Sequence, residues 1–377
     1  MIPLAVPNLN GNEQLYLDRC IETTFVSSVG EYVNQFEEMV ADATGSKHAV
    51  ATASGTTGLH AALTAVGVKY DELVIIPSFT FIATANSVAH CGAMPWLMDV
   101  SEHDWCLNPS IVRSELEKNT ERRNGSIFHR ELGKRVAAIM PVYTLGNIPD
   151  MREFCKVANE YGLPLVVDAA CAIGATFEGE SFGKLADMSV LSFNGNKTVT
   201  CGGGGAVVGD DEEMLAHVRH LTTTARVWPD YDFDEVGFNY RMTNVQAAIG
   251  CAQMEKLSSF VERKRQVSNF YAREFADEAY DMFKRTKGSS CWFSGIVLKS
   301  GSTLADAKGV CERLHEKGIE AKPFWKPIHL QKPYLKCLKG DMSVTEALWQ
   351  RIVTLPCSTG ITDEELNEVV CEVKSLS

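Results

Sequence analysis

Lys197 stands between two apolar segments, 188–193 and 206–208, that read as buried strands. Four consecutive glycines, at 202–205, separate it from the second segment. Burying the charge of a lysine between two strands costs free energy, which favours the neutral amine. A neutral amine in such a place can form a Schiff base. A lysine beside a glycine run is also often a solvated loop residue, so other segments must decide between the two interpretations.

A second segment, 53–63, places small and hydroxyl-bearing residues, including Gly55 and Thr56, at the start of an apolar helix. The free N–H groups and the dipole at such a helix start favour an anion. The same pattern also fits an ordinary helix cap. No Gly-Lys-Ser/Thr follows, which excludes a Walker loop.

Asp168 directly follows the apolar segment 163–167, at the end of a strand where open α/β sheets bind ligands. A carboxylate there can pair with the protonated ring nitrogen of pyridoxal phosphate, or it can cap the next helix. Segment 77–84 also follows a strand, and one of its aromatic residues can lie on a ring face or belong to the core. Together, the four segments predict a site for a phosphate-bearing aldehyde cofactor on one edge of a sheet.

These segments belong to a regular alternation of short apolar strands and helices from about residue 48 to 210. This alternation indicates an α/β fold with a mainly parallel sheet covered on both faces. The polar segment 119–135 is expected to be a surface excursion, and 244–277 a long helix linking two domains. The expected strands are 73–76, 95–98, 136–140 and 163–167, and the expected helices are 57–66, 82–91, 109–118 and 150–161.

The composition narrows the class of protein. A chain of 377 residues with net charge −12 fits two domains and argues against nucleic acid as the main partner. The sequence shows neither a signal peptide nor an apolar run long enough to span a membrane, which predicts a cytoplasmic protein. Its 12 cysteines form no C-x-x-C pair, which favours reduced buried thiols over disulfides or a metal site.

Taken together, the four segments and two later ones, 237–244 and 326–334, resemble the DegT-type sugar aminotransferases over essentially the whole chain. These are fold-type I pyridoxal phosphate enzymes that act on nucleotide-linked keto sugars. The resemblance implies a large cofactor-binding domain, 1–255, with a mainly parallel mixed sheet. It also implies a smaller C-terminal α+β domain, 256–377, on which the N-terminal segment packs.

The resemblance also implies roles for individual residues. Lys197 would bind the cofactor as a Schiff base and shuttle a proton between Cα and C4′, with Asp168 at the pyridinium nitrogen. The other implied cofactor contacts are Phe81 over the ring, Gly55, Thr56 and Ser192 at the phosphate, and Asn239 at the phosphate of the neighbouring subunit's cofactor. A site shared in this way requires a homodimer.

Four residues, Ser28, Arg226, Lys326 and His329, are either contacts to the nucleotide or sugar or exposed loop residues. Cys171 stands where relatives usually carry Gln or His close to the cofactor's ring oxygen. A thiol is a weak donor, so the hydrogen bond at that position is in doubt.

The residues at 192–197 and the glycine run resemble most closely those of the family branch that makes precursors of legionaminic acid and diacetylbacillosamine. The expected reaction is amination at C4 of a nucleotide-linked 4-keto-6-deoxy-N-acetylhexosamine, with L-glutamate as donor and UDP favoured over GDP as carrier. Amination of a 3-keto sugar is the alternative within the family. A non-catalytic regulator is disfavoured by the intact Lys197 and Asp168. A dinucleotide oxidoreductase is disfavoured because the glycines open no helix.

Overall fold

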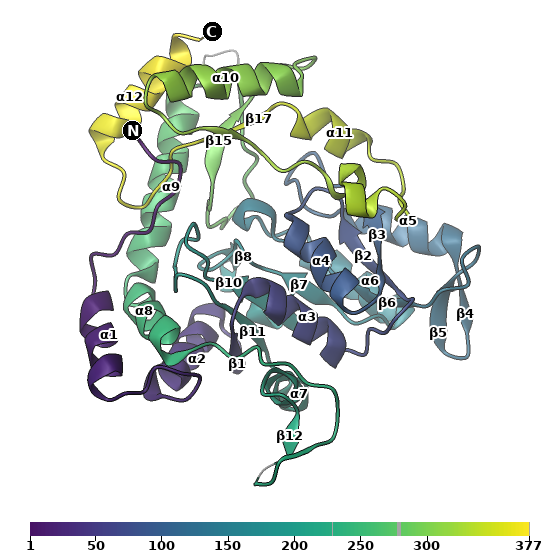
Figure 1. Ribbon diagram of the computed structural model, residues 1–377. Helices are drawn as coiled ribbons and strands as arrows, with labels where there is room; N and C mark the ends of the chain where they lie inside the picture. The colour runs from purple at the N-terminus through teal and green to yellow at the C-terminus, as the bar shows by residue number, and fades with distance from the viewer. Residues whose placement is uncertain (228, 277–279, 377) are drawn as a thin grey trace.

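A mixed β-sheet forms the centre of the larger part of the molecule (Figure 1), in a computed structural model that describes residues 1–227, 229–276 and 280–376. Strand β11 runs antiparallel to both of its neighbours, whereas the other strand pairs, and the bridges that join β7 to β6, are parallel. The prediction of an α/β fold with a mainly parallel sheet is therefore confirmed. The strands follow the order β1 (His48–Thr52), β11 (Gly205–Gly209), β10 (Met188–Ser192), β7 (Val166–Asp168), β6 (Val136–Ile139), β2 (Leu73–Pro77) and β3 (Met94–Met98), with β7 and β6 joined by isolated parallel bridges.

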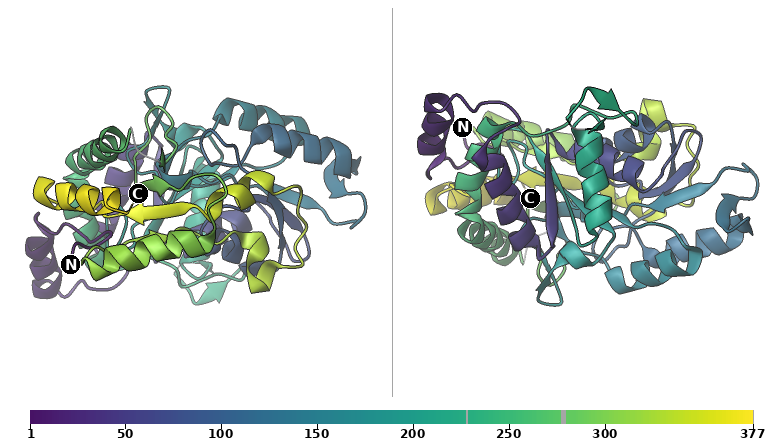
Figure 2. Two further views of the ribbon diagram at one scale, coloured as in Figure 1. Left: turned by 90° about the horizontal axis from the view of Figure 1, so that it is seen from above. Right: turned by 90° about the horizontal axis from the view of Figure 1, so that it is seen from below.

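Helices cover both faces of this sheet, as the views from above and below show (Figure 2). Along β2, Leu73 and Ile75 point into one apolar cluster, whereas Val74 and Ile76 point into another. Both faces of the strand are buried, which explains its continuous apolar sequence. The first cluster packs against α2 (Glu31–Thr44), α5 (Pro109–Asn119), α6 (Met151–Tyr161) and α8 (Asn244–Met254), and the second against α3 (Gly55–Ala65), α4 (Ile82–His90) and α7 (Glu212–Thr222).

The C-terminal part is built on a smaller antiparallel sheet, with strand order β14, β15, β17, β16. Ile2 and Leu4 of the N-terminal segment share its apolar cluster, and Ile2 forms a bridge with Ile319. The elements of this part are α9 (Leu257–Glu274), β14 (Asp281–Met282), β15 (Ser294–Val297), α10 (Leu304–Glu316), β16 (Lys322–Pro323), α11 (Ser343–Trp349), β17 (Ile352–Leu355) and α12 (Asp363–Lys374).

Short elements complete the described chain. Helix α1 (Glu13–Glu22) precedes α2 near the N-terminus, and β12 (Arg226–Val227) pairs with β13 (Asp232–Phe233) in an arm that projects from the body (Figure 1). The remaining elements are β8 (Thr176–Phe177), β9 (Glu180–Ser181) and the 3-10 helices Thr144–Gly146, Phe182–Lys184, Ile328–Leu330 and Lys332–Tyr334.

Two expected elements differ from the structure. Segment 119–135 contains an antiparallel hairpin, β4 (Thr120–Arg123) and β5 (Ser126–His129), because Asn124 and Gly125 both adopt positive φ and make a tight turn. The expected helix 244–277 is two helices, α8 and α9, since α8 packs in the core of the large sheet and α9 packs on the C-terminal part. Asp277 lies outside the described residues, and the division of the chain at 255/256 into two domains stays a prediction.

All twelve cysteines are free thiols. Within the described ranges, we find no helix that combines the length and the apolar character needed to cross a bilayer.

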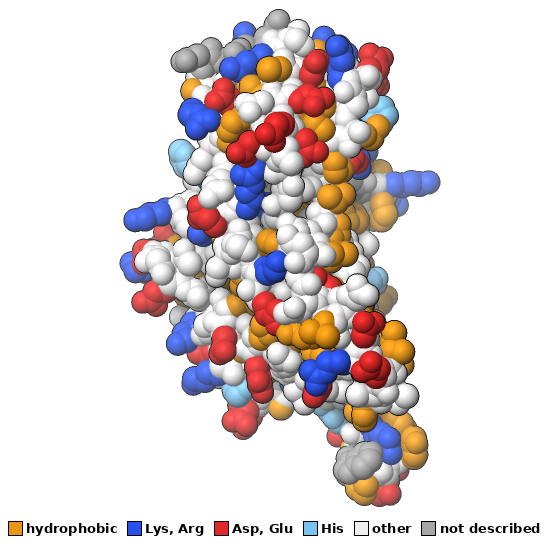
Figure 3. All heavy atoms as spheres, turned by 90° about the vertical axis from the view of Figure 1, so that its left-hand side faces the viewer, with side chains coloured by type: hydrophobic (Ala, Val, Ile, Leu, Met, Phe, Trp, Pro, Cys, Tyr) orange, Lys and Arg blue, Asp and Glu red, His pale blue; other side chains and the backbone are white. Residues whose placement is uncertain are grey.

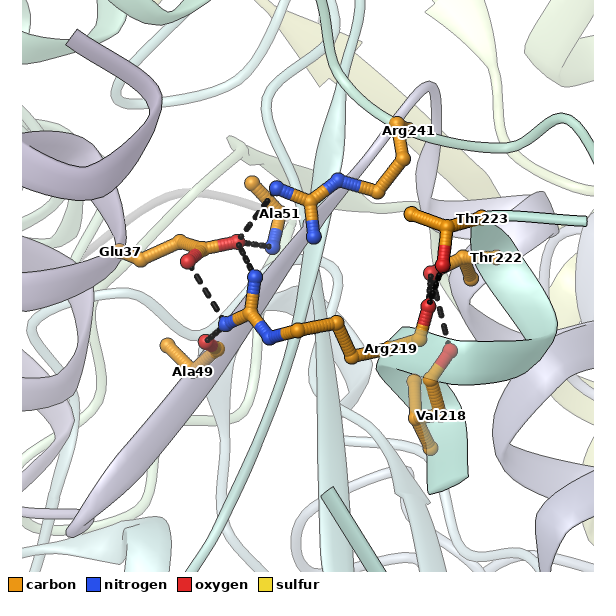
Figure 4. A network of polar contacts seen from close by, with 8 residues as sticks. All are labelled: Glu37, Ala49, Ala51, Val218, Arg219, Thr222, Thr223 and Arg241. Atoms are coloured by element: carbon orange, nitrogen blue, oxygen red, sulfur yellow. Dashed lines mark hydrogen bonds and ion pairs between the residues drawn. The ribbon is translucent and has the colours of Figure 1, made fainter. Parts of the chain in front are cut away.

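A buried carboxylate ties α2 to the edge of the large sheet (Figure 4). Glu37 accepts a hydrogen bond from the backbone N–H of Ala51 at 2.8 Å and pairs with Arg219 at 2.8 Å and Arg241 at 3.4 Å. Arg219 also donates to the carbonyl of Ala49 at 3.1 Å. One carboxylate therefore fixes a strand, a helix and the segment around Arg241 against one another.

We predict that Glu37→Ala lowers the free energy of unfolding by about 3 kcal/mol, because it leaves two guanidinium groups without their shared carboxylate. Glu37→Gln keeps an oxygen acceptor and is expected to lose less. Glu38→Ala is the matched control, since Glu38 is the next residue along α2 and is exposed. Urea unfolding measures the difference, and an equal effect of both alanine variants would contradict a structural role for the network.

Candidate active site

A cavity of about 340 Å³ gathers most of the predicted cofactor residues. It lies where β7 and β10 end and α3 and α4 begin. A larger hollow of about 650 Å³, between α2, β1 and α7, is lined by the Glu37 and Arg219 side chains and contains none of the predicted residues. The predicted residues that line the smaller cavity are Gly55, Thr56, Phe81, Asp168, Cys171, Ser192 and Lys197.

One end of the cavity is the N-terminus of α3. Ser54 caps this helix: its hydroxyl accepts from the N–H of Thr57 at 3.1 Å, and the Thr57 hydroxyl accepts from the N–H of Ser54 at 3.0 Å. Gly55 and Thr56 are the first two helical residues, whose N–H groups have no acceptor within the helix. The arrangement is an anion site at a helix N-terminus.

Glycines allow this helix to start against the sheet. A Cβ on Gly55 would lie 3.0 Å from the Cβ of Ser192, and a Cβ on Gly205 would lie 2.6 Å from the backbone nitrogen of Gly55. Gly204 has a φ of +112°, which side chains rarely adopt. The glycine run is therefore needed for the close approach that brings Ser192 beside the anion site.

Asp168 carries a buried carboxylate to the cavity wall. It accepts a hydrogen bond from the Thr84 hydroxyl at 2.7 Å and one from the N–H of Ala170 at 3.1 Å. Burial raises the pKa of Asp168, and these hydrogen bonds oppose the rise. Among the residues that the structure describes, no Lys, Arg or His forms an ion pair with it. A buried carboxylate with neutral partners fits a ligand that brings a positive charge, such as the protonated ring nitrogen of pyridoxal phosphate.

Lys197 lies in the turn that follows β10, with its amine in the cavity. Its Nζ donates to the Sγ of Cys171 at 3.3 Å and lies 3.8 Å from the centre of the Trp292 ring. Burial raises the pKa of the Cys171 thiol, and the positive charge of Lys197 opposes this. The anion site, the buried carboxylate and the amine thus share one cavity.

Three aromatic residues from the C-terminal part close the cavity, and sequence analysis did not find them: Trp292, Phe293 and Trp325. The Trp325 ring lies 6.0 Å from the ring of Phe81, which is 53% exposed. These residues are far along the chain from the motifs of the sheet, so the motifs did not point to them. The one sequence signal for a role in the site was that Trp325 directly precedes the predicted Lys326. Thr84 was also missed, because its segment was considered for aromatic residues alone.

The predicted residue Asn239 lies outside this cavity and is exposed. Its segment nevertheless runs beside the start of α3: the carbonyl of Tyr240 accepts from the N–H of Ala53 at 2.7 Å, and Arg241 bridges to Thr52.

The four residues predicted to contact substrate do not line the cavity either. Ser28 is half-buried ahead of α2, and Lys326 is exposed. Arg226 lies in the β12–β13 arm, where its guanidinium lies 3.9 Å from the Tyr231 ring centre. His329 is buried, and its ring nitrogens contact the Ser78 hydroxyl at 2.6 Å and Glu346 at 3.0 Å. Burial lowers the pKa of His329.

Comparisons with known proteins identify the family of the chain. Residues 7–374 match the model of the DegT/DnrJ/EryC1/StrS aminotransferase family. A GDP-perosamine synthase of Caulobacter vibrioides is 36% identical over 379 residues, covering 98% of this chain and 96% of the relative. A UDP-4-amino-4,6-dideoxy-N-acetyl-β-L-altrosamine transaminase of Campylobacter jejuni is 32% identical over 337 residues, covering 87% and 85%.

The fold is similar to that of a sugar aminotransferase from Streptococcus pneumoniae in its PLP form, with a TM-score of 0.88 over 100% of this chain and 98% of the other, at 20% identity. With the nearly full-length family match and the arrangement of Lys197 and Asp168, these similarities establish the class of the enzyme. The chain belongs to the DegT/DnrJ/EryC1/StrS aminotransferase family and is a pyridoxal phosphate-dependent aminotransferase.

Proposed function

We propose that this enzyme transfers the amino group of L-glutamate to C4 of a nucleotide-linked 4-keto-6-deoxy sugar. The observation that carries the proposal is the single cavity in which Lys197, Asp168 and the helix N-terminus at Gly55 meet. The names of both relatives supply the class of substrate, because each specifies an amino sugar on a nucleotide carrier. They differ in the carrier: the C. jejuni name supports UDP and the N-acetyl group, whereas the C. vibrioides name supports GDP.

In this proposal, the N–H groups of Gly55 and Thr56 and the hydroxyl of Ser192 hold the phosphate of the cofactor. Asp168 accepts a hydrogen bond from the ring nitrogen and favours its protonated form. Lys197 would anchor the cofactor, and its amine would act as the base that removes the donor's Cα proton and as the acid that returns a proton. The bound cofactor carries the amino group between the two substrates and serves as the electron sink.

The proposal includes a homodimer in which Asn239 reaches the cofactor phosphate of the neighbouring subunit. Asn239 is exposed on its own subunit, while the backbone beside it is held firmly by Ala53 and Glu37. Large apolar side chains are exposed in the N-terminal segment, where Phe25 and Val29 lie, and around the β12–β13 arm, where Val236 is 85% exposed. Figure 3 shows apolar side chains among charged ones on one such face and on the projecting arm.

The substrate assignment is tested with purified enzyme, L-glutamate and a panel of GDP- and UDP-linked 4-keto-6-deoxy sugars. With L-glutamate alone we expect at most one equivalent of 2-oxoglutarate per active site. Continuous formation is expected only with a keto sugar present, together with a product aminated at C4. Lys197→Ala is expected to abolish turnover because no other cavity residue supplies an amine, whereas Lys184→Ala, an exposed lysine of a 3-10 helix, serves as the matched control. Absence of product with every sugar, or turnover in Lys197→Ala, would contradict the proposal.

Asp168→Asn is predicted to lower kcat by several orders of magnitude, because a neutral amide cannot stabilise the protonated ring nitrogen. Thr84→Val removes a single hydrogen bond to the same carboxylate, so we expect a loss of about tenfold. Steady-state kinetics with the cofactor content of each variant measured in parallel separate catalysis from binding. Near-normal rates in Asp168→Asn would overturn the pairing.

Shared active sites are tested by subunit complementation. Lys197→Ala and Asn239→Ala are each expected to be strongly impaired, but a mixed dimer has one site that lacks neither residue. Refolded together, the two variants are predicted to regain about one quarter of wild-type activity. Lys197→Ala mixed with Asp168→Asn is the control, because both residues belong to the same subunit's site and no mixed dimer repairs it. No recovery in the first mixture would exclude the shared site.

A further inference from the structure

Trp292 contacts both the proposed catalytic lysine and the residue before it. The centre of its ring lies 3.8 Å from the Nζ of Lys197, and its indole N–H donates to the carbonyl of Asn196 at 2.8 Å. The side chain is buried, at 3% exposed. The face of the ring packs against the amine and limits the positions that the amine can take. One side chain therefore contacts both the amine and the backbone of the turn that carries it.

The backbone of Trp292 is itself held in place. Its N–H donates to the carbonyl of Leu145 at 3.2 Å, and its carbonyl accepts from the Nζ of Lys264 at 2.9 Å. Lys264 is buried and also donates to the carbonyl of Cys357 at 2.7 Å. The next carbonyl along, that of Phe293, accepts from the guanidinium of Arg285. Hydrogen bonds to two consecutive carbonyls hold the backbone of this segment in place.

The same segment also contacts Cys171, the second residue that lies beside the amine. The hydroxyl of Ser290 donates to the carbonyl of Cys171 at 2.8 Å, and the Sγ of Cys171 accepts from Lys197 at 3.3 Å. Cys291, which lies between Ser290 and Trp292 in the chain, adopts a φ of 53°, a left-handed conformation that is unfavourable for a residue with a side chain. The turn thus places Ser290 on the backbone of Cys171, whose thiol contacts the amine, and places Trp292 directly against the amine.

We propose that Trp292 is a positioning residue for Lys197: it holds the amine at the cavity wall, ready to capture the aldehyde of pyridoxal phosphate. This inference rests on the proposed role of Lys197 and is independent of which sugar is aminated. Trp292 acts through Lys197, so its removal weakens the covalent part of cofactor binding and leaves the phosphate and ring contacts intact.

The test compares two ligands on apo-protein: pyridoxal phosphate and 4′-deoxypyridoxine 5′-phosphate, which keeps the ring and phosphate and lacks the aldehyde. For Trp292→Leu, we expect affinity for pyridoxal phosphate to fall about tenfold, because the turn that carries the amine loses its hydrogen bond to the indole N–H. Trp292→Phe keeps a ring face but loses the N–H donor, so a smaller loss is expected. Affinity for the deoxy analogue is expected to stay within about twofold of wild type in both variants.

Equal weakening of both ligands would show that Trp292 only shapes the cavity, and unchanged affinity for pyridoxal phosphate would show that it does not position the amine. Either result overturns the proposal. Trp349→Leu is the matched control, because Trp349 is also buried but lies on α11, away from the cavity, and neither affinity is expected to change. If Trp292→Leu does not fold, the ratio of the two affinities in Trp292→Phe decides. A failure of the sugar assignment would appear in the substrate panel and leave this ratio unaffected.

Discussion

The buried carboxylate of Asp168 is the constraint on which the site depends. It reaches the cavity wall and accepts hydrogen bonds from a hydroxyl and one backbone N–H, in surroundings that disfavour its charge. Such a group is best satisfied by a ligand that brings a positive charge of its own. In the proposed function, the protonated ring of the cofactor is that ligand, with its phosphate at the N-terminus of α3 and its aldehyde at the amine of Lys197.

The sheet explains why these groups meet. Strands β2, β7 and β10 run parallel, so the residues that follow them lie at one edge. Strand β11 runs in the opposite direction and begins at that edge with glycines, which lets the N-terminus of α3 lie directly on it. Strand β1, on the far side of β11, runs in the same direction as β10, so α3, which follows β1, starts at the same edge and places its anion site beside the carboxylate and the amine.

The parts of this arrangement that sequence reasoning predicted have local signals. The strand Leu73–Pro77 is a continuous apolar run, and Asp168 follows such a run directly. The break between α8 and α9 carried no local signal because it arises from packing against two different cores. Trp292 was missed for the same reason: its importance comes from contacts with Asn196 and Lys197, which the chain brings together from distant positions.

The two sides of the cavity contribute different chemical groups. In the proposed function, the sheet side supplies the backbone N–H groups and the carboxylate that hold the cofactor. The C-terminal side supplies the aromatic rings of Trp292, Phe293 and Trp325, and the carbonyls of the first two accept hydrogen bonds from Lys264 and Arg285. Trp292 contacts Lys197, which leaves Phe293 and Trp325 as the aromatic residues proposed to face the substrate. On this proposal, substitutions on the sheet side change cofactor binding, whereas substitutions at Phe293 and Trp325 change the choice of keto sugar.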